Sequence, residues 1–288
     1  MDSFGLTQQQ IEHFNKNGFL KLEQCIGTEL LILLQQATNE WIEKALSNDA
    51  QGKQVNNTAI VPGKQNTRCV LRINNIHEIG HTVTFELLQH PEIIGAVQSI
   101  CGVNVITEYE SLLVKQEADE QVIPWHQDVV YNRDFRVVTV GVYLDDSTPE
   151  NGCLKIVPGT QYQKHDICAL AQKHGFDSSD IMNVCAMPGD VIIHDAMIVH
   201  ASDKSRSTNN RRTLYFEFRS VEHIRQEGYR TQNWIKNREH LHQLATEYTT
   251  RPINSGTDSE DEIIRDIQQY YLSAQPGQPG NFCLGEYM

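Results

Sequence analysis

Apolar residues in the first hundred positions recur at intervals of three and four, which is the spacing of a helix that buries one face. The pattern predicts helices over residues 7–17, about 28–46 and 91–100, with a short strand over 19–22. Thr7 with Gln10 has the spacing of a capping box, and Gly18 and Gly102 follow two of these helices, where glycine commonly ends them. We expect the helices to cover a sheet.

Between residues 47 and 67 the pattern is lost and polar side chains dominate, including Asn56, Asn57 and Gly63. A stretch of this length without apolar periodicity predicts a long loop, and long loops in compact domains often close over a site. We therefore treat it as a candidate lid.

After residue 102 the spacing changes from helical to alternating. It predicts strands over 103–115, 137–144, 191–200 and 213–218, separated by turns rich in Pro, Gly, Asn and Asp. Strands of this kind, preceded by helices, predict a mainly β fold with flanking α-helices, a double-stranded β-helix of the jelly-roll, cupin-like kind. Helical spacing returns over 234–248, and Ser259 with Glu262 forms a capping-box pattern before a further helix.

We expect one domain over residues 1–288, because β barrels of this length commonly fold as single units. It would have a helical N-terminal part (about 1–102), a jelly-roll core (about 103–220), a helical C-terminal extension (about 221–273) and an irregular tail (274–288). The sequence contains no internal repeat.

The chain carries 37 acidic and 24 basic residues, and the formal charge of -13 repels nucleic-acid phosphates and anionic membranes. No apolar stretch approaches the roughly twenty residues that cross a bilayer, and residues 1–10 lack the features of a signal peptide. Seven cysteines without CxxC spacing disfavour a thiolate zinc site and a disulfide framework. We expect a cytoplasmic monomer or homodimer with reduced thiols, no nucleic-acid partner and no membrane insertion.

The candidate chemistry centres on His126 and Asp128, which flank Gln127. In an extended strand residues i and i+2 share a face, so both side chains can bind one ion while Gln127 points away. His200, at the end of the apolar stretch 191–200, supplies a second imidazole. Two histidines and one carboxylate on one face of a metal leave other positions open, which is the ligand set of non-haem Fe(II) oxygenases.

The same residues have simpler interpretations. Short metal motifs arise by chance in a chain with 12 histidines, and His126 and His200 could be partly buried histidines that only make hydrogen bonds. His194 competes with His200, because both belong to one face of the same predicted strand. We place His194 beside the ligands, as a residue that orients them.

Arg211 stands at the start of the next predicted strand, and a guanidinium grips a carboxylate through two parallel hydrogen bonds. This suits a dicarboxylate cosubstrate. Neighbours on a strand point to opposite faces, so at most one of Arg211 and Arg212 can face the metal, unless both are surface charges at a strand edge. Ser202 could add a hydroxyl to the same carboxylate or could be a turn residue.

Several segments together resemble the phytanoyl-CoA dioxygenase family of Fe(II)- and 2-oxoglutarate-dependent oxygenases, over roughly residues 6–220. They are LTQQQIEHFNKNGFL (6–20), PWHQD (124–128), LDDSTPENGCL (144–154), VPGT (157–160), PGDV (188–191), HAS (200–202) and RRTL (211–214). The resemblance implies iron ligands at His126, Asp128 and His200. It also implies that Arg211 binds the distal carboxylate of 2-oxoglutarate and that the hydroxyl of Ser202 supports it.

The chain departs from many members of that family at two positions. Gln161 stands where they carry His, and Gly141 where they carry Trp. A glycine at position 141 would leave space beside the cosubstrate, so the pocket is either wider or filled by Tyr143 or Tyr109.

The resemblance implies a dioxygenase that uses Fe(II), 2-oxoglutarate and O2, releases succinate and CO2, and hydroxylates a small lipid-like, amino-acid-derived or secondary metabolite. Related halogenases need a small residue in place of the carboxylate, so Asp128 favours hydroxylation, desaturation or ring formation. Two alternatives are a metal-dependent lyase or hydrolase with the same triad and a non-catalytic jelly-roll binding module. A strict requirement for 2-oxoglutarate, with iron-dependent release of succinate, would distinguish the dioxygenase from both alternatives. No cluster of Lys and Arg marks a site for CoA phosphates.

Overall fold

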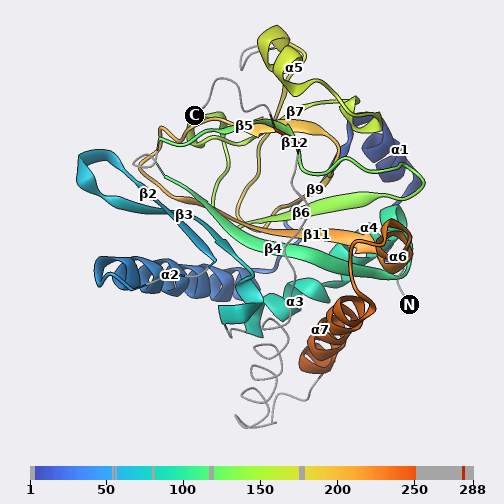
Figure 1. The fold of residues 1–288 in the computed structure, drawn as a ribbon, viewed down its shortest axis with the longest axis horizontal. Helices are drawn as coiled ribbons and strands as arrows, with labels where there is room; N and C mark the ends of the chain where they lie inside the picture. Colours follow the sequence, from blue (N-terminus) through green and yellow to red (C-terminus); the bar gives the residue numbers. More distant parts are fainter. Residues whose placement is uncertain are drawn as a thin grey trace.

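Two antiparallel sheets face each other in the computed structural model, which describes residues 4–53, 55, 57–79, 82–116, 120–174, 179–250 and 281–282 (Figure 1). The larger sheet has seven strands in the order β1 (Phe19–Leu22), β9 (Val191–Asp195), β6 (Val137–Tyr143), β11 (Arg211–Ser220), β4 (Val105–Lys115), β3 (Arg68–Asn74) and β2 (Thr58–Pro62). The smaller sheet has five, in the order β12 (Asn281–Phe282), β5 (Ile123–Gln127), β10 (Val199–Ser202), β7 (Leu154–Val157) and β8 (Met182–Val184). The predicted mainly β jelly roll with flanking helices is confirmed.

Helices cover the outer face of the larger sheet, on the side away from the smaller one (Figure 1). Alternation along the strands explains this, because Val140 of β6 and Phe216 of β11 pack in one buried cluster with Leu34 and Trp41. The helices on this side are α2 (Thr28–Ala50), α3 (Phe85–Leu88), α4 (Pro91–Cys101) and α7 (Gln232–Thr250).

The remaining helices lie at the ends and outside the smaller sheet. Helix α1 (Gln8–Asn17) begins with the predicted capping box at Thr7 and ends at Gly18, whose φ of 77° is left-handed. Trp125 and Val199 of the smaller sheet pack against Ile167 of α5 (Ile167–His174). The other helical segments are α6 (Val221–Glu227) and the 3-10 turns Lys64–Asn66, Ile76–Ile79, Thr82–Thr84, Pro149–Asn151 and Thr160–Tyr162.

The inner faces of the two sheets enclose the interior of the jelly roll. Tyr143 and Ile192 of the larger sheet meet Leu154 and Ile156 of the smaller sheet in a buried apolar cluster. Along β11, Leu214, Phe216 and Phe218 belong to the helix-covered core, so their alternate neighbours face the interior. These neighbours are polar: Arg211, Thr213, Tyr215, Glu217 and Arg219.

The expectation of a long loop over 47–67 was wrong. Helix α2 continues to Ala50, and β2 pairs with β3 as a hairpin at the edge of the larger sheet. Strand β2 has only three apolar residues, Ala59, Ile60 and Val61, and it ends at Pro62. So short an edge strand lacks the alternation that identifies a strand in sequence.

The stretch 191–200 is two strands rather than one. β9 ends at Asp195 in the larger sheet, and β10 starts at Val199 in the smaller sheet. Both strands and the connection between them are buried, so the apolar run gave no sign of the turn. His194 and His200 therefore lie on facing sheets and not on one strand face.

Other expectations concern the cysteines, the membrane and the C-terminal segment. Cys25, Cys69, Cys101, Cys153 and Cys185 are free, whereas Cys168 is disulfide-bonded, so the expectation of reduced thiols was wrong for that residue. Within the described residues, every helix is too short or too polar to cross a bilayer. The capping-box pattern at 259–262 lies outside the described residues, and so does most of the predicted irregular tail. Within that tail Asn281–Phe282 form strand β12, which pairs with β5, so the expectation of an irregular tail was wrong for these residues.

Candidate active site

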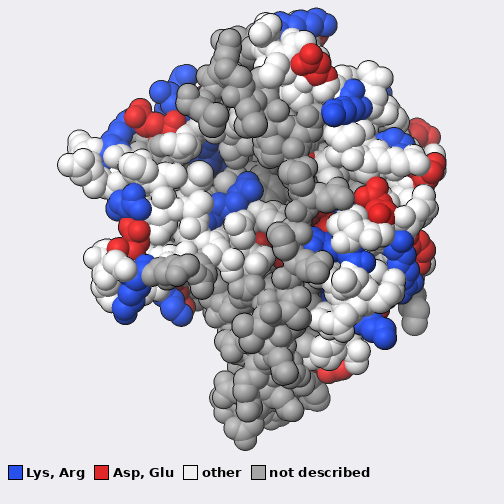
Figure 2. Space-filling view, viewed as in Figure 1, with Lys and Arg blue, Asp and Glu red and all other residues white. Residues whose placement is uncertain are grey.

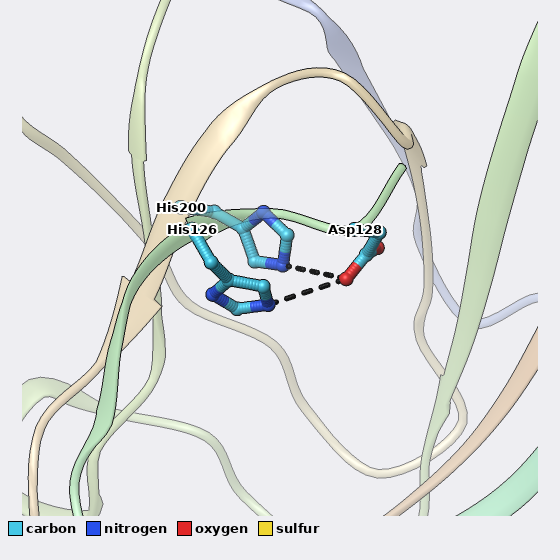
Figure 3. Close-up of side chains that lie close together, drawn as sticks. All are labelled: His126, Asp128 and His200. Carbon is cyan, nitrogen blue, oxygen red and sulfur yellow. Dashed lines mark ion pairs between the residues drawn. The ribbon is translucent and has the colours of Figure 1, made fainter. Parts of the chain in front are cut away.

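Three predicted ligands meet between the two sheets. His126 is on β5, Asp128 follows the end of that strand, and His200 is on β10, where it lies directly opposite His126 in register. The two imidazole centroids are 4.0 Å apart. Oδ1 of Asp128 lies 3.2 Å from Nε2 of His126 and 3.6 Å from Nε2 of His200 (Figure 3). One ligand atom from each residue lies within 4.8 Å of the other two.

These separations fit a single metal ion. Ligand bonds of about 2.1 Å at right angles place neighbouring donor atoms about 3 Å apart. The other ring nitrogens face backbone oxygens: Nδ1 of His126 is 2.8 Å from the carbonyl of Pro124, and Nδ1 of His200 is 2.9 Å from that of Ile198. A hydrogen on each Nδ1 leaves the Nε2 lone pairs free to bind metal.

The second oxygen of Asp128 is fixed from the larger sheet. Oγ1 of Thr139 on β6 donates a hydrogen bond to Oδ2 at 3.0 Å, and Nε2 of His194 on β9 is 3.4 Å from the same atom. The ring of His194 lies 4.8 Å from that of His200. His194 therefore lies beside the triad, against the carboxylate oxygen that faces away from both predicted histidine ligands.

Burial and mutual proximity set the protonation states that metal binding needs. Burial lowers the pKa of His200 to about 3, so its imidazole is neutral at neutral pH. Burial alone would raise the pKa of Asp128, but the three adjacent imidazoles, His200, His126 and His194, hold it well below its usual value. A carboxylate and a neutral imidazole are the forms that coordinate a cation.

Gln127 points away from the triad, as its place between two ligands predicts. Its amide nitrogen donates to the carbonyl of Met197 at 2.6 Å and to that of Gln163 at 3.0 Å. The first bond ties the end of β5 to the connection between β9 and β10, and the second ties it to the residue after the 3-10 turn Thr160–Tyr162. Both help to hold the strand that carries His126.

Arg211 and Ser202 lie together near the loop at Gly152. Ser202 Oγ donates to the Gly152 carbonyl at 2.6 Å, and Nη1 of Arg211 donates to the same oxygen. Arg212 faces the opposite side of the sheet, where it pairs with Asp145 at 2.7 Å. The structure thus puts Arg211, and not Arg212, on the inner face.

Lys115 is a candidate site residue that the sequence analysis missed. It is the last residue of β4, is fully buried and lies opposite Arg211 in register. Its Nζ donates to the carbonyl of Gln121 at 2.8 Å. The sequence signal was a lysine that ends the apolar run LLVK, a position where the strand is expected to be buried. Lysine is almost never fully buried without a charged or polar partner.

The surroundings of Arg211 fit a bound carboxylate. Its Nε and the hydroxyl of Thr213, two residues further along β11, are buried without a hydrogen-bond partner among the described residues. Buried polar atoms nearly always have a partner, so orphaned donors beside two cations indicate a ligand that accepts hydrogen bonds there. A dicarboxylate has the required chemistry.

Tyrosine rings occupy the space next to Gly141. A Cβ at position 141 would lie 2.9 Å from Cε1 of Tyr215 and 3.4 Å from Cε2 of Tyr143. Tyr109 is instead hydrogen-bonded to Asn74. Of the two tyrosines expected to fill this space, Tyr143 does so and Tyr109 does not. Tyr215, the cross-strand partner of Gly141, occupies the rest of the space.

Gln161, the other departure from the family pattern, is fully buried, and its amide donates to the Asn15 carbonyl at 2.8 Å. It ties the turn after β7 to helix α1, and no contact links it to the triad among the residues described.

A jelly roll that holds two imidazoles and one carboxylate beside a buried arginine defines the class of non-haem iron oxygenases. Residues 14–213 match the family described as phytanoyl-CoA dioxygenase (PhyH), and the chain belongs to this family. Its relatives are iron- and 2-oxoglutarate-dependent dioxygenases, and this chain is a dioxygenase of the same kind with the same cofactors.

Individual relatives are distant. The chain is 22% identical to a probable phytanoyl-CoA dioxygenase of Caenorhabditis elegans over 233 residues, which covers 73% of this chain and 74% of that protein. It resembles the structure of EvdMO1 with a TM-score of 0.64 and 24% identity over 74% of this chain, and it spans only half of that protein. It resembles EctD from S. alaskensis with 2-oxoglutarate and 5-hydroxyectoine with a TM-score of 0.61 and 19% identity, covering 77% and 78% of the two chains.

Proposed function

We propose that this dioxygenase hydroxylates a small organic molecule at an iron centre held by His126, Asp128 and His200. The observation that carries the proposal is the convergence of these three side chains from two strands of the smaller sheet, with ligand atoms within 4.8 Å of one another. The comparison with EctD supports a small polar substrate, since that protein is bound to 5-hydroxyectoine.

Bound iron and 2-oxoglutarate supply the oxidising power, with consumption of O2 and release of succinate and CO2. The protein binds the cosubstrate and the substrate and orients them. In the proposed arrangement Arg211 and Lys115 hold the distal carboxylate of 2-oxoglutarate, and Ser202 fixes the Gly152 carbonyl that Arg211 also contacts. Asp128 occupies the position that a halide would need, which favours hydroxylation over halogenation.

The test is succinate release in the presence of Fe(II) and 2-oxoglutarate, screened across lipid-like, amino-acid-derived and secondary-metabolite classes. Wild-type protein should release succinate only with both cofactors, and His126→Ala and Asp128→Ala should abolish the release. His240→Ala, a change to an exposed histidine on α7, is the matched control and should have no effect. Full activity of either ligand variant would refute the assignment.

The same assay separates the two alternatives. A lyase or hydrolase built on this triad would turn over with a divalent metal and without 2-oxoglutarate, and a binding module would release no succinate. The orphaned donors around Arg211 favour the oxygenase, because the other two functions leave them without a ligand.

We also propose that the chain forms a single oxygenase domain in the cytoplasm, as a monomer or homodimer without nucleic-acid partners. The acidic net charge of -13 supports the absence of nucleic-acid partners, since it repels phosphate backbones. Light scattering coupled to gel filtration would determine the oligomeric state.

A further inference from the structure

A line of polar side chains crosses the inner face of the larger sheet, starting at the metal triad. It begins with Thr139, whose hydroxyl donates to Asp128. In register, Glu217 of β11 lies between Thr139 of β6 and Tyr109 of β4. The hydroxyl of Tyr109 in turn donates to Oδ1 of Asn74 on β3 at 2.7 Å. The line therefore runs from the proposed iron site across four neighbouring strands, β6, β11, β4 and β3.

Arg72 leans towards this line and away from Arg211. Its backbone pairs with Leu113, two residues before Lys115, which pairs with Arg211. Nη1 of Arg72 nevertheless donates to the hydroxyl of Tyr109 at 3.1 Å, four residues back from Leu113 along β4. Its guanidinium thus lies away from the end proposed for the distal carboxylate of 2-oxoglutarate.

Arg72 is half-buried, and no carboxylate of the described residues forms an ion pair with its guanidinium. By contrast, Arg68 on the same strand lies 2.8 Å from Asp49. In the space-filling view, Lys and Arg side chains are visible on the side of β2 and β3 (Figure 2). A half-buried guanidinium held by a phenol hydroxyl suits an anionic ligand.

Glu217 supplies the opposite charge closer to the triad. Nε and Nη2 of Arg219 both contact its Oε1 at 2.9 Å, which leaves Oε2 for another donor. Arg219 also pairs with Glu108 at 2.7 Å, so one guanidinium is shared between two carboxylates. Burial raises the pKa of Glu217 to about 7, and Arg219 opposes this change. A cation next to Oε2 would complete the compensation of the Glu217 charge.

We propose that the substrate is a small zwitterion, whose acidic group binds Arg72 and whose protonated amine lies beside Glu217. This inference rests on the proposed function and adds the substrate class. Neighbouring strands are about 4.8 Å apart, so the backbones of β6 and β3 are separated by about 14 Å. With side chains projecting from both ends, this interval suits a molecule of amino-acid size whose reacting carbon faces the triad.

The test uses the iron-loaded full-length protein with 2-oxoglutarate and measures succinate release. The probes are the common L-amino acids and short aminoalkylphosphonates, each beside its N-acetyl derivative and its amide or ester. We expect at least one zwitterion to stimulate release, and its two neutralised forms to lose roughly ten- to a hundredfold in kcat/KM, the effect of one charge-assisted hydrogen bond. Arg72→Gln should abolish the preference for the acid over the amide, and Glu217→Gln the preference for the amine over the N-acetyl form.

Arg68→Gln, on the same strand, is the matched control and should keep both preferences. Failure of every zwitterion to stimulate release, or equal activity of the neutralised forms, overturns the inference. So does an Arg72→Gln variant that binds 2-oxoglutarate more weakly but retains the preference for the acid, because Arg72 would then belong to the cosubstrate. Substrate-free succinate release and 2-oxoglutarate binding by the wild type report on the proposed function separately.

Discussion

The hydroxyl of Thr139 donates a 3.0 Å hydrogen bond to Oδ2 of Asp128, which joins the two sheets at the proposed metal site. Oδ1 of the same carboxylate faces His126 and His200. One oxygen of Asp128 is therefore held by the larger sheet while the other faces the histidines of the smaller sheet, so the geometry of the site depends on how the sheets pack.

Replacing Thr139 with Val should weaken Fe(II) binding by about ten- to a hundredfold, because partners that orient a ligand commonly have effects of this size. Thr139→Ser keeps the hydroxyl and should bind Fe(II) like the wild type. Anaerobic titration with Fe(II) gives both dissociation constants. Equal affinities for the Val variant and the wild type would show that His194 alone fixes Asp128.

Replacing Arg211 or Arg212 should have different effects, because the two side chains lie on opposite faces of β11. Arg211→Leu should raise the KM for 2-oxoglutarate by about thirty- to a hundredfold, from loss of a charge-assisted contact of about 2–3 kcal/mol. Arg212→Leu removes contacts to Asp145 and to Asn39 of α2, so it should lower the free energy of unfolding with little change in that KM. Steady-state kinetics and urea unfolding of both variants check the pair, and the reverse pattern would exchange the two roles.

Gly141→Ala should destabilise the protein by about 1–3 kcal/mol, the usual cost of overpacking. The new Cβ would lie 2.9 Å from the ring of Tyr215, which would have to shift. Adding Tyr215→Leu should recover part of the loss, since the shorter side chain lacks the obstructing atom. Urea unfolding of the two single variants and the double variant measures this coupling; strictly additive effects would mean that the ring moves without cost.

The buried imidazole of His77 should make the folded protein less stable in acid. The residue is fully buried with its Nδ1 3.0 Å from Oγ1 of Thr84, and burial lowers its pKa from 6.5 to about 4. The unfolded chain therefore binds a proton between these values, while the folded protein does not. The free energy of unfolding is therefore highest above pH 6.5 and decreases as the pH falls towards 4. Between pH 7 and pH 5 this one residue lowers it by about 2 kcal/mol.

Urea unfolding at both pH values tests this linkage. His77→Gln should show a smaller decline than the wild type, whereas the exposed change His240→Gln should leave the decline as it is. An undiminished decline in His77→Gln would assign the effect to other groups, among them His242, whose pKa burial lowers to about 3.

Local signals in the sequence predicted the long helices and the strands with clear alternation. The capping box at Thr7 and the apolar positions of α2, such as Leu34 and Trp41, depend on neighbours three or four residues away. The edge strand β2 and the connection between β9 and β10 were missed, because sheet pairing and a change of sheet depend on distant residues.

The candidate site divides in the same way. His126 and Asp128 could be identified from their i, i+2 spacing, and strand alternation limited the inner position to one of Arg211 and Arg212. Contacts between strands could not be identified locally. Lys115 lies next to Arg211, and Tyr215 next to Gly141, only because β4, β11 and β6 pair in a particular register.

The most direct test of the account is anaerobic binding of Fe(II) and 2-oxoglutarate, followed by the visible charge-transfer absorption of the complex. The account predicts one Fe(II) per chain in the wild type, an absorption that requires both components, and loss of both signals in His126→Ala, Asp128→Ala and His200→Ala. Wild-type iron affinity and absorption in the His200→Ala variant would contradict it.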